Sequence, residues 1–176
     1  MPSTVDTAKT VSVRAPDVPG TPHLHITSDS FAEGGKIPKK HVYKGCGGEN
    51  VSPHLAWSGA PAGTKSFVIT CFDPDAPTGS GYWHWLVYNV PATVSSLAAG
   101  DTKLGGGKSG RTDYGETGYG GPCPPKGDGE HRYIYRVYAL DVPSINASEG
   151  TGGASVTFMT RGHVLATGAL TAKFGH

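Results

Sequence analysis

The sequence predicts a mainly β domain in which short strands are joined by loops rich in glycine and proline. Glycine and proline together contribute 41 of the 176 residues (27 and 14), and these residues favour turns between short elements. The 16 aromatic residues (3 Trp, 8 Tyr and 5 Phe) and the 36% hydrophobic content supply apolar surface for a core. That surface argues against a disordered chain, because its burial can offset the entropy lost on folding.

Five segments are expected to form the strands. The longer ones combine aromatic and β-branched residues in apolar or alternating runs, which is the pattern of half-buried or buried strands. Two of these runs end at a proline, at Asp73-Pro74 and at Pro91, where a central strand cannot continue. The predicted strands are residues 65–72, 82–90 and 131–140, with shorter ones at 23–27 and 54–57.

Helix is expected only near the C-terminal end of the sequence. Met159, Ala166 and Leu170 approximate an apolar stripe with a period of 3.6 residues, and Ser155 is placed to cap its start. By contrast, residues 97–126 are rich in glycine and contain no apolar run. A long irregular loop inside a compact domain is usually functional, so we expect this loop to contribute to a site.

Composition also bounds the domain organisation and the partners. Residues 1–22 contain four prolines and no apolar periodicity, which predicts a flexible N-terminal arm followed by a single domain at 23–176. The net charge of +1, from 15 basic and 14 acidic residues, argues against nucleic acid as a partner. No apolar run is long enough for an integral membrane segment or a signal peptide, which predicts a cytoplasmic protein.

The three cysteines, Cys46, Cys71 and Cys123, are an odd number and show no Cys-x-x-Cys spacing. This pattern favours reduced thiols over a disulfide framework. Reduced thiols agree with a cytoplasmic location.

Three short motifs place polar groups beside the predicted strands. Each has a plain structural explanation: a turn with two solvated carboxylates, a histidine packed among aromatic residues, and a stiff loop. Each motif is therefore weak when it is taken alone. The motifs are Asp-Pro-Asp-Ala-Pro at 73–77, Tyr-Trp-His-Trp at 82–85, and the stretch 120–133, which contains Gly-Pro-Cys-Pro-Pro-Lys-Gly and His-Arg-Tyr.

In this order and spacing the three motifs resemble the signature regions of the phosphatidylethanolamine-binding proteins. Glu-Asn-Val-Ser-Pro at 49–53 and Gly-His-Val-Leu-Ala at 162–166 also resemble that family. The residue before the paired prolines is Cys123, whereas many animal members have a glycine there. The sequence is therefore similar to the prokaryotic branch of the family, whose proteins are often called Raf-kinase-inhibitor-like.

The resemblance implies a β-sandwich-like fold with a large antiparallel sheet, a smaller sheet and a C-terminal helix. It also implies one pocket, at an end of the large sheet, that takes small anionic or phosphorylated ligands. Carried over by motif, the ligand-binding residues are Asp73, His84, Pro124, Pro125, His131 and Tyr133, with Asp75 close by and with Gly121 and Cys123 on the rim.

The residue types agree with that expectation. Imidazole N–H groups of His84 and His131 can donate to an anionic oxygen, and more strongly when they are protonated. Asp73 can accept the other N–H of a histidine and fix its tautomer. Tyr133 offers a hydroxyl donor on an apolar ring.

Other functions remain as alternatives. An enzyme is disfavoured because Gly-x-Ser-x-Gly is absent and no serine lies inside the three motifs, so we predict no catalytic residue and no cofactor. Asp73, Asp75, His84 and His131 have the ligand types of a metal site but no compact spacing, so no metal is predicted. Cys123 is a reactive thiol or a small packed residue. A protein target, such as an inhibited kinase or protease, is the main alternative to a small ligand.

Overall fold

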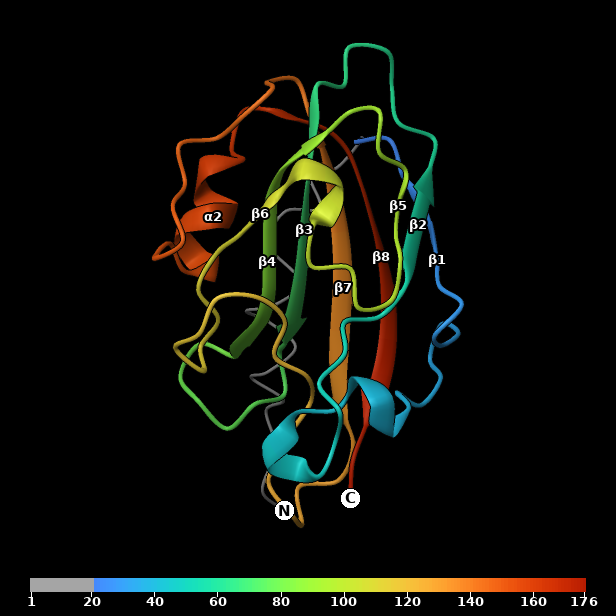
Figure 1. Ribbon diagram of the computed structural model, residues 1–176, viewed down its shortest axis with the longest axis vertical. Helices are drawn as coiled ribbons and strands as arrows, with labels where there is room; N and C mark the ends of the chain where they lie inside the picture. Colours follow the sequence, from blue (N-terminus) through green and yellow to red (C-terminus); the bar gives the residue numbers. More distant parts are fainter. Residues whose placement is uncertain (1–20) are drawn as a thin grey trace, which may run out of the picture.

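The computed structural model describes residues 21–176, which form two antiparallel sheets (Figure 1). The predicted arm at 1–22 lies outside the described residues except for its last two. The larger sheet has the order β6 (Lys108–Ser109), β4 (Tyr82–Pro91), β3 (Ser66–Asp73), β7 (His131–Leu140) and β8 (Val164–Phe174). The smaller sheet has the order β1 (His25–Thr27), β2 (Leu55–Ser58) and β5 (Ser96–Leu97).

The strand predictions are confirmed. The three long predicted strands correspond to β3, β4 and β7, each with bounds within one or two residues of the expectation, and the two short ones correspond to β1 and β2. Residues 97–126 are mostly irregular, as expected, and contain one 3-10 helix, η3 (Leu104–Gly106), and strand β6. The mainly β class with a larger and a smaller sheet is therefore confirmed.

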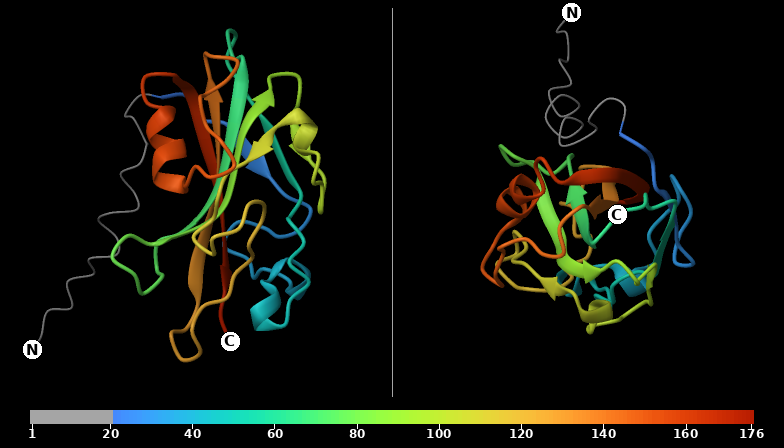
Figure 2. Two further views of the ribbon diagram at one scale, coloured as in Figure 1. Left: turned by 60° about the vertical axis from the view of Figure 1, so that its left-hand side comes forward. Right: turned by 90° about the horizontal axis from the view of Figure 1, so that it is seen from above.

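The larger sheet is covered on both faces (Figure 2). Along β3, Phe67 and Ile69 pack in the core shared with the smaller sheet, whereas Val68 packs in a second core on the other face. Successive side chains of a strand point to opposite faces, so this central strand is buried throughout. The second core includes Val156 of the single described α-helix, α2 (Gly153–Met159).

The predicted C-terminal helix is wrong in its position. The helix α2 is only seven residues long and ends at Met159, and Ser155 lies inside it rather than at its N-cap, which is Gly152. The residues after it form β8, the longest strand, in which Ala166, Leu170 and every second residue around them are buried. The period along this segment is therefore two, not 3.6.

Gly168 explains why β8 lies where it does. A Cβ atom at residue 168 would overlap the backbone carbonyl of Leu24, so only glycine allows the two backbones to approach. Two backbone hydrogen bonds join the segments here, from Leu24 N to Thr167 O (3.0 Å) and from Thr167 N to Pro22 O (3.1 Å).

Two further 3-10 helices, η1 (Lys39–His41) and η2 (Lys44–Cys46), lie at the end of the larger sheet where β3 ends and β7 begins, at the bottom of Figure 1. This is the end at which the sequence predicts the site. Among residues 21–176, no helix is long and apolar enough to cross a membrane.

Candidate functional site

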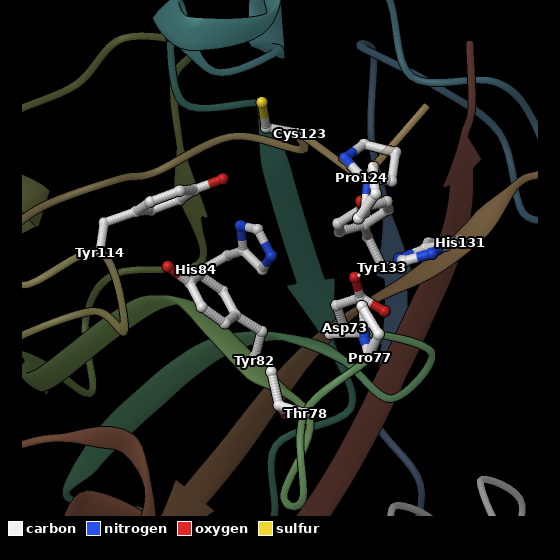
Figure 3. Close-up of a pocket in the computed structure, with 12 residues that line it drawn as sticks. Asp73, Pro77, Thr78, Tyr82, His84, Tyr114, Cys123, Pro124, His131 and Tyr133 are labelled. Atoms are coloured by element: carbon white, nitrogen blue, oxygen red, sulfur yellow. Dashed lines mark hydrogen bonds and ion pairs between the residues drawn. The ribbon is translucent and has the colours of Figure 1, made fainter. Parts of the chain in front are cut away.

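A pocket of about 250 Å³ opens at this end of the larger sheet (Figure 3). Its polar side chains come from three neighbouring strands, because Asp73 ends β3, His84 lies near the start of β4, and His131 and Tyr133 lie at the start of β7. We call these four residues the pocket floor. The full lining is Asp73, Ala76, Pro77, Thr78, Tyr82, His84, Tyr114, Cys123, Pro124, Pro125, His131 and Tyr133.

Asp73 and His131 form a buried ion pair in the floor. Nδ1 of His131 lies 2.8 Å from Oδ2 of Asp73, and its Nε2 lies 3.1 Å from Oδ2 of Asp128. Burial would lower the pKa of His131, but the hydrogen bonds and charges of these two carboxylates outweigh it and raise that pKa. Burial also raises the pKa of Asp73, and the His131 contact works against that shift. Because both ring nitrogens face carboxylate oxygens, His131 is an imidazolium that donates from both.

His84 has the opposite protonation state. Its Nδ1 donates to the carbonyl oxygens of Gly120 (2.8 Å) and Gly121 (3.1 Å), so that nitrogen carries the proton. Burial lowers the pKa of His84 to about 4, with the two carbonyls acting in the other direction. The ring is therefore neutral near pH 7, and its Nε2 is an acceptor. The expectation that His84 donates to an anion is wrong for this state of the ring.

Tyr133 has a buried hydroxyl with no partner. The residue is 0% exposed, and its hydroxyl is one of two buried side-chain polar atoms in residues 21–176 without a hydrogen bond, the other being Nε1 of Trp57. Its ring meets the His84 ring edge to face, with centroids 5.2 Å apart, and Figure 3 shows both residues at the pocket. Burial raises the pKa of Tyr133, so the hydroxyl stays protonated and can donate.

One side of the pocket is made by part of the segment 121–125, and we call this segment the pocket wall. Pro124 and Pro125 line the pocket as predicted, and so does Cys123. Cys123 is bonded to Cys46 of η2 in a disulfide, so the expectation of three reduced thiols is wrong and holds only for the buried Cys71. The two cysteines are 77 residues apart in the sequence, and only the fold brings them together. The cytoplasmic location loses the support of reduced thiols and stays a prediction.

Two predicted site residues act from outside the lining. The Asp75 carboxylate accepts two hydrogen bonds from the Arg132 side chain, at 2.9 and 2.7 Å, and one from the backbone N–H of Arg132. Partial burial would raise the pKa of Asp75, but the hydrogen bonds and charge of Arg132 outweigh it and lower that pKa. Asp75 therefore ties the segment after β3 to β7. Gly121 lies behind the pocket, where its carbonyl accepts from His84 and from the Tyr114 hydroxyl (2.8 Å).

Several lining residues were not predicted. Tyr82 and Tyr114 form an aromatic side of the pocket, with ring centroids 5.0 Å apart, and each ring also contacts His84. Tyr82 is the first residue of the Tyr-Trp-His-Trp motif, which is a signal that it shares the strand end with His84. Asp128 follows the paired prolines in the third motif, but nothing in the sequence indicates its contact with His131. Within residues 21–176, no group of three or more His, Cys, Asp or Glu residues is arranged to hold a metal ion.

Comparison with known proteins identifies the family to which the chain belongs. The sequence profile of the phosphatidylethanolamine-binding protein family matches residues 27–175. The UPF0098 protein YbhB of Escherichia coli is 49% identical over 161 residues, which are 86% of this chain and 99% of YbhB. The crystal structure of E. coli YbcL superposes with a TM-score of 0.83 at 42% identity, covering 88% of this chain and 99% of YbcL.

A homologue from Chlamydia trachomatis gives a TM-score of 0.78 at 36% identity, covering 88% of this chain and 98% of the homologue. The Plasmodium vivax phosphatidylethanolamine-binding protein, at 16% identity and a TM-score of 0.59, shows the same fold. The family profile spans most of the chain, and the bacterial relatives are similar over nearly their whole length. The chain is a member of the phosphatidylethanolamine-binding protein family.

Proposed function

We propose that the pocket binds a small phosphorylated ligand and does so without chemical turnover. The observation that carries the proposal is the buried Tyr133 hydroxyl without a hydrogen-bond partner. A buried polar group left unpaired costs about 1–3 kcal/mol. A ligand oxygen that accepts from this hydroxyl removes that cost, so the free energy of binding includes the gain.

The charges of the floor select the form of the ligand. One imidazolium, His131, lies between the carboxylates of Asp73 and Asp128, so the floor has no excess of positive charge. A phosphate monoester that keeps one proton fits better than a dianion, because its P–OH can donate to Nε2 of neutral His84. Its anionic oxygen can accept from Tyr133.

An ammonium group on the same ligand would be attracted to Asp73 and Asp128. Phosphoethanolamine, the head group in the family's name, combines an ammonium and a phosphate. The pocket volume of about 250 Å³ is below the range of about 300–1,000 Å³ that is usual for drug-sized ligands. A head group therefore suits the pocket better than a whole lipid.

The lining supports binding rather than nucleophilic catalysis. Cys123 is committed to a disulfide, and the hydroxyl of Thr78 donates to the carbonyl of Gly81 at 2.6 Å. Neither side chain lies beside a neutral base in hydrogen-bond contact, as an activated nucleophile does. We therefore expect no hydrolysis of generic esters or phosphomonoesters above background.

The test is Tyr133→Phe, which should move stability and affinity in opposite directions. Without ligand the variant should be more stable by about 1 kcal/mol, because it no longer buries an unpaired hydroxyl. Its affinity for phosphoethanolamine should fall about tenfold, which corresponds to one lost hydrogen bond of about 1.4 kcal/mol. Chemical denaturation measures the first quantity and isothermal titration calorimetry the second.

The matched control is Tyr88→Phe, which removes the hydroxyl of a tyrosine that is buried in the core on the other face of the sheet. It should leave affinity unchanged. Separate titrations with inorganic phosphate, sulfate and ethanolamine show whether the phosphate or the ammonium group of phosphoethanolamine supplies the binding free energy. Wild-type protein that binds none of these probes, or a Tyr133→Phe variant with undiminished affinity, contradicts the proposal.

A further inference from the structure

We infer that the Cys46–Cys123 disulfide is a redox switch for the pocket, and that a dithiol reductant weakens ligand binding by releasing the pocket wall. The inference rests on the proposed function, because it concerns the regulation of the same site. It starts from how the wall is held.

The wall depends on contacts from outside itself. Three of its five residues are prolines, which have no backbone N–H and so donate no hydrogen bond. Its first residue, Gly121, is held by several hydrogen bonds: its N–H donates to Oδ1 of Asn50 (2.7 Å), and its carbonyl accepts from His84 and Tyr114. Further along, Pro122 O accepts from Tyr43 N at 3.0 Å and Pro124 O accepts from Nε2 of His176 at 2.8 Å. The disulfide between Cys123 and Cys46 is the covalent link among these contacts. Breaking it leaves residues 123–125 with single hydrogen bonds, while Gly121 stays anchored.

The disulfide is placed where a reductant can reach it and where its loss affects the pocket. Both cysteines are only partly buried. Cys123 lines the pocket, while Figure 3 shows its sulfur pointing away from the floor, toward the short helices. The third cysteine, Cys71, is fully buried in the core and cannot exchange with the pair. The chemistry is therefore confined to one partly buried bond at the pocket rim.

His176 assists one of the two sulfurs. Its Nε2 lies 3.7 Å from Sγ of Cys46 and donates to Pro124 O, so that nitrogen carries a proton. While the disulfide is intact this N–H donates to Pro124 O, and when the S–S bond breaks it can turn to the thiolate of Cys46; a thiolate stabilised in this way is the better leaving group. Cys46 is thus the leaving sulfur, and Cys123 is the sulfur that is attacked.

The reaction balances as thiol–disulfide exchange with a dithiol. A thiolate of the reductant bonds to Sγ of Cys123, and the electron pair of the broken S–S bond goes to Cys46, which takes up a proton. The second thiol of the reductant then displaces Cys123 from the mixed disulfide. The reductant leaves as a disulfide, and the protein has gained two electrons, two protons and two thiols.

The experiment compares oxidised protein with protein reduced by dithiothreitol, using the full chain. Reduction should weaken phosphoethanolamine binding about tenfold, as it would if only a tenth of the molecules kept the wall in the binding position. Amide hydrogen exchange at residues 119–126 should become faster at the same time. The double variant Cys46→Ser/Cys123→Ser should match the reduced protein and ignore dithiothreitol, and Cys71→Ala should respond as wild type does.

The two readouts separate the two proposals. Oxidised protein that binds no probe, but whose exchange at 119–126 rises on reduction, contradicts the proposed function and supports the release of the wall by reduction. Equal affinity and equal exchange in the two redox states overturn the switch, and this comparison needs only wild-type protein if the double variant fails to fold. His176→Ala should be reduced several-fold more slowly than wild type; an unchanged rate removes His176 from the inference.

Discussion

The pocket floor and the pocket wall are built in opposite ways. The floor lies at the ends of β3, β4 and β7, which are neighbours in an antiparallel ladder, and its side chains are almost completely buried. The wall at 121–125 belongs to no strand and is held by hydrogen bonds to its carbonyls and by a disulfide. The floor fixes charges and donors through the sheet, whereas the position of the wall depends on a few contacts that can change.

This difference has a consequence for substitutions. Damage to the floor removes a charge partner inside the core, so it should lower the stability of the whole domain. Damage to the wall shifts a loop at the rim, so it should affect ligand binding more than folding. The following predictions test that division.

The largest effect is expected from Asp73→Ala. The variant leaves His131 buried without its partner at 2.8 Å, and removing one member of a buried ion pair costs about 3–5 kcal/mol. The matched control is Asp141→Ala, which removes a pair to His163 of similar length, 2.9 Å, whose side chains are more than 40% exposed. An exposed pair contributes up to about 1 kcal/mol. Equal losses of unfolding free energy in the two variants would show that the floor pair has no special role.

A smaller effect on stability is expected from Gly121→Ala in the wall. A Cβ at residue 121 would overlap the backbone carbonyl of His41, and forcing extra atoms into a packed site costs about 1–3 kcal/mol. Because the wall must shift to make room, affinity for phosphoethanolamine should fall as well. Gly79→Ala is the control, since a Cβ at residue 79 meets no atom within 4 Å. Calorimetry that shows unchanged binding in Gly121→Ala would mean that the wall does not shape the pocket.

The third effect is the pH dependence contributed by His84. Its pKa is lowered from 6.5 to about 4 by burial, so the unfolded chain takes up a proton in this interval while the folded protein does not. Stability should therefore fall as pH falls from about 6.5 to about 4, by at most about 1.4 kcal/mol per pH unit. The His84→Asn variant should lose less stability than wild type over this pH range.

His131 acts with the opposite sign. Its pKa is raised in the folded state, so its contribution is complete below pH 6.5 and is lost as pH rises through the raised value. Denaturation curves recorded at several pH values distinguish the two histidines. His84 governs the loss of unfolding free energy at acid pH, and His131 governs the loss at neutral to alkaline pH. If the His84→Asn variant loses as much stability at acid pH as wild type does, another group causes that loss.

The strands and the floor could be predicted because their signals are local. Asp73 stands at the end of β3, directly before a proline, and His84 and His131 stand in recognisable motifs near the starts of β4 and β7. The alternating pattern of β8 is hard to recognise in the sequence. Three of its buried positions, Ala166, Gly168 and Ala172, are small residues and give a weak periodic signal. Its identity depends on pairing with β7 along its whole length, and the sequence of the segment does not reveal that pairing.

The electrostatic details could not be predicted because they depend on distant backbone groups. His84 is neutral because the core buries it, and its proton lies on Nδ1 because the carbonyls of Gly120 and Gly121 fold against that nitrogen. The disulfide joins residues that share no motif. Asp128 faces His131 only because the loop that contains it turns back over the start of β7. Each of these contacts is a product of the tertiary structure.

The pairing of β8 also decides when the domain can fold. This strand completes one edge of the larger sheet and contacts residues 22–24 and 36 through backbone bridges. Residues synthesised early therefore wait for residues 164–174 before their backbone groups find partners. Such a high share of contacts between distant parts of the chain is associated with slow folding. The edge of β7 that pairs with β8 remains unpaired until residues 164–174 are synthesised. Between the synthesis of β7 and that of β8 the growing chain thus presents an open strand to its neighbours, and this is when we expect it to depend most on chaperones.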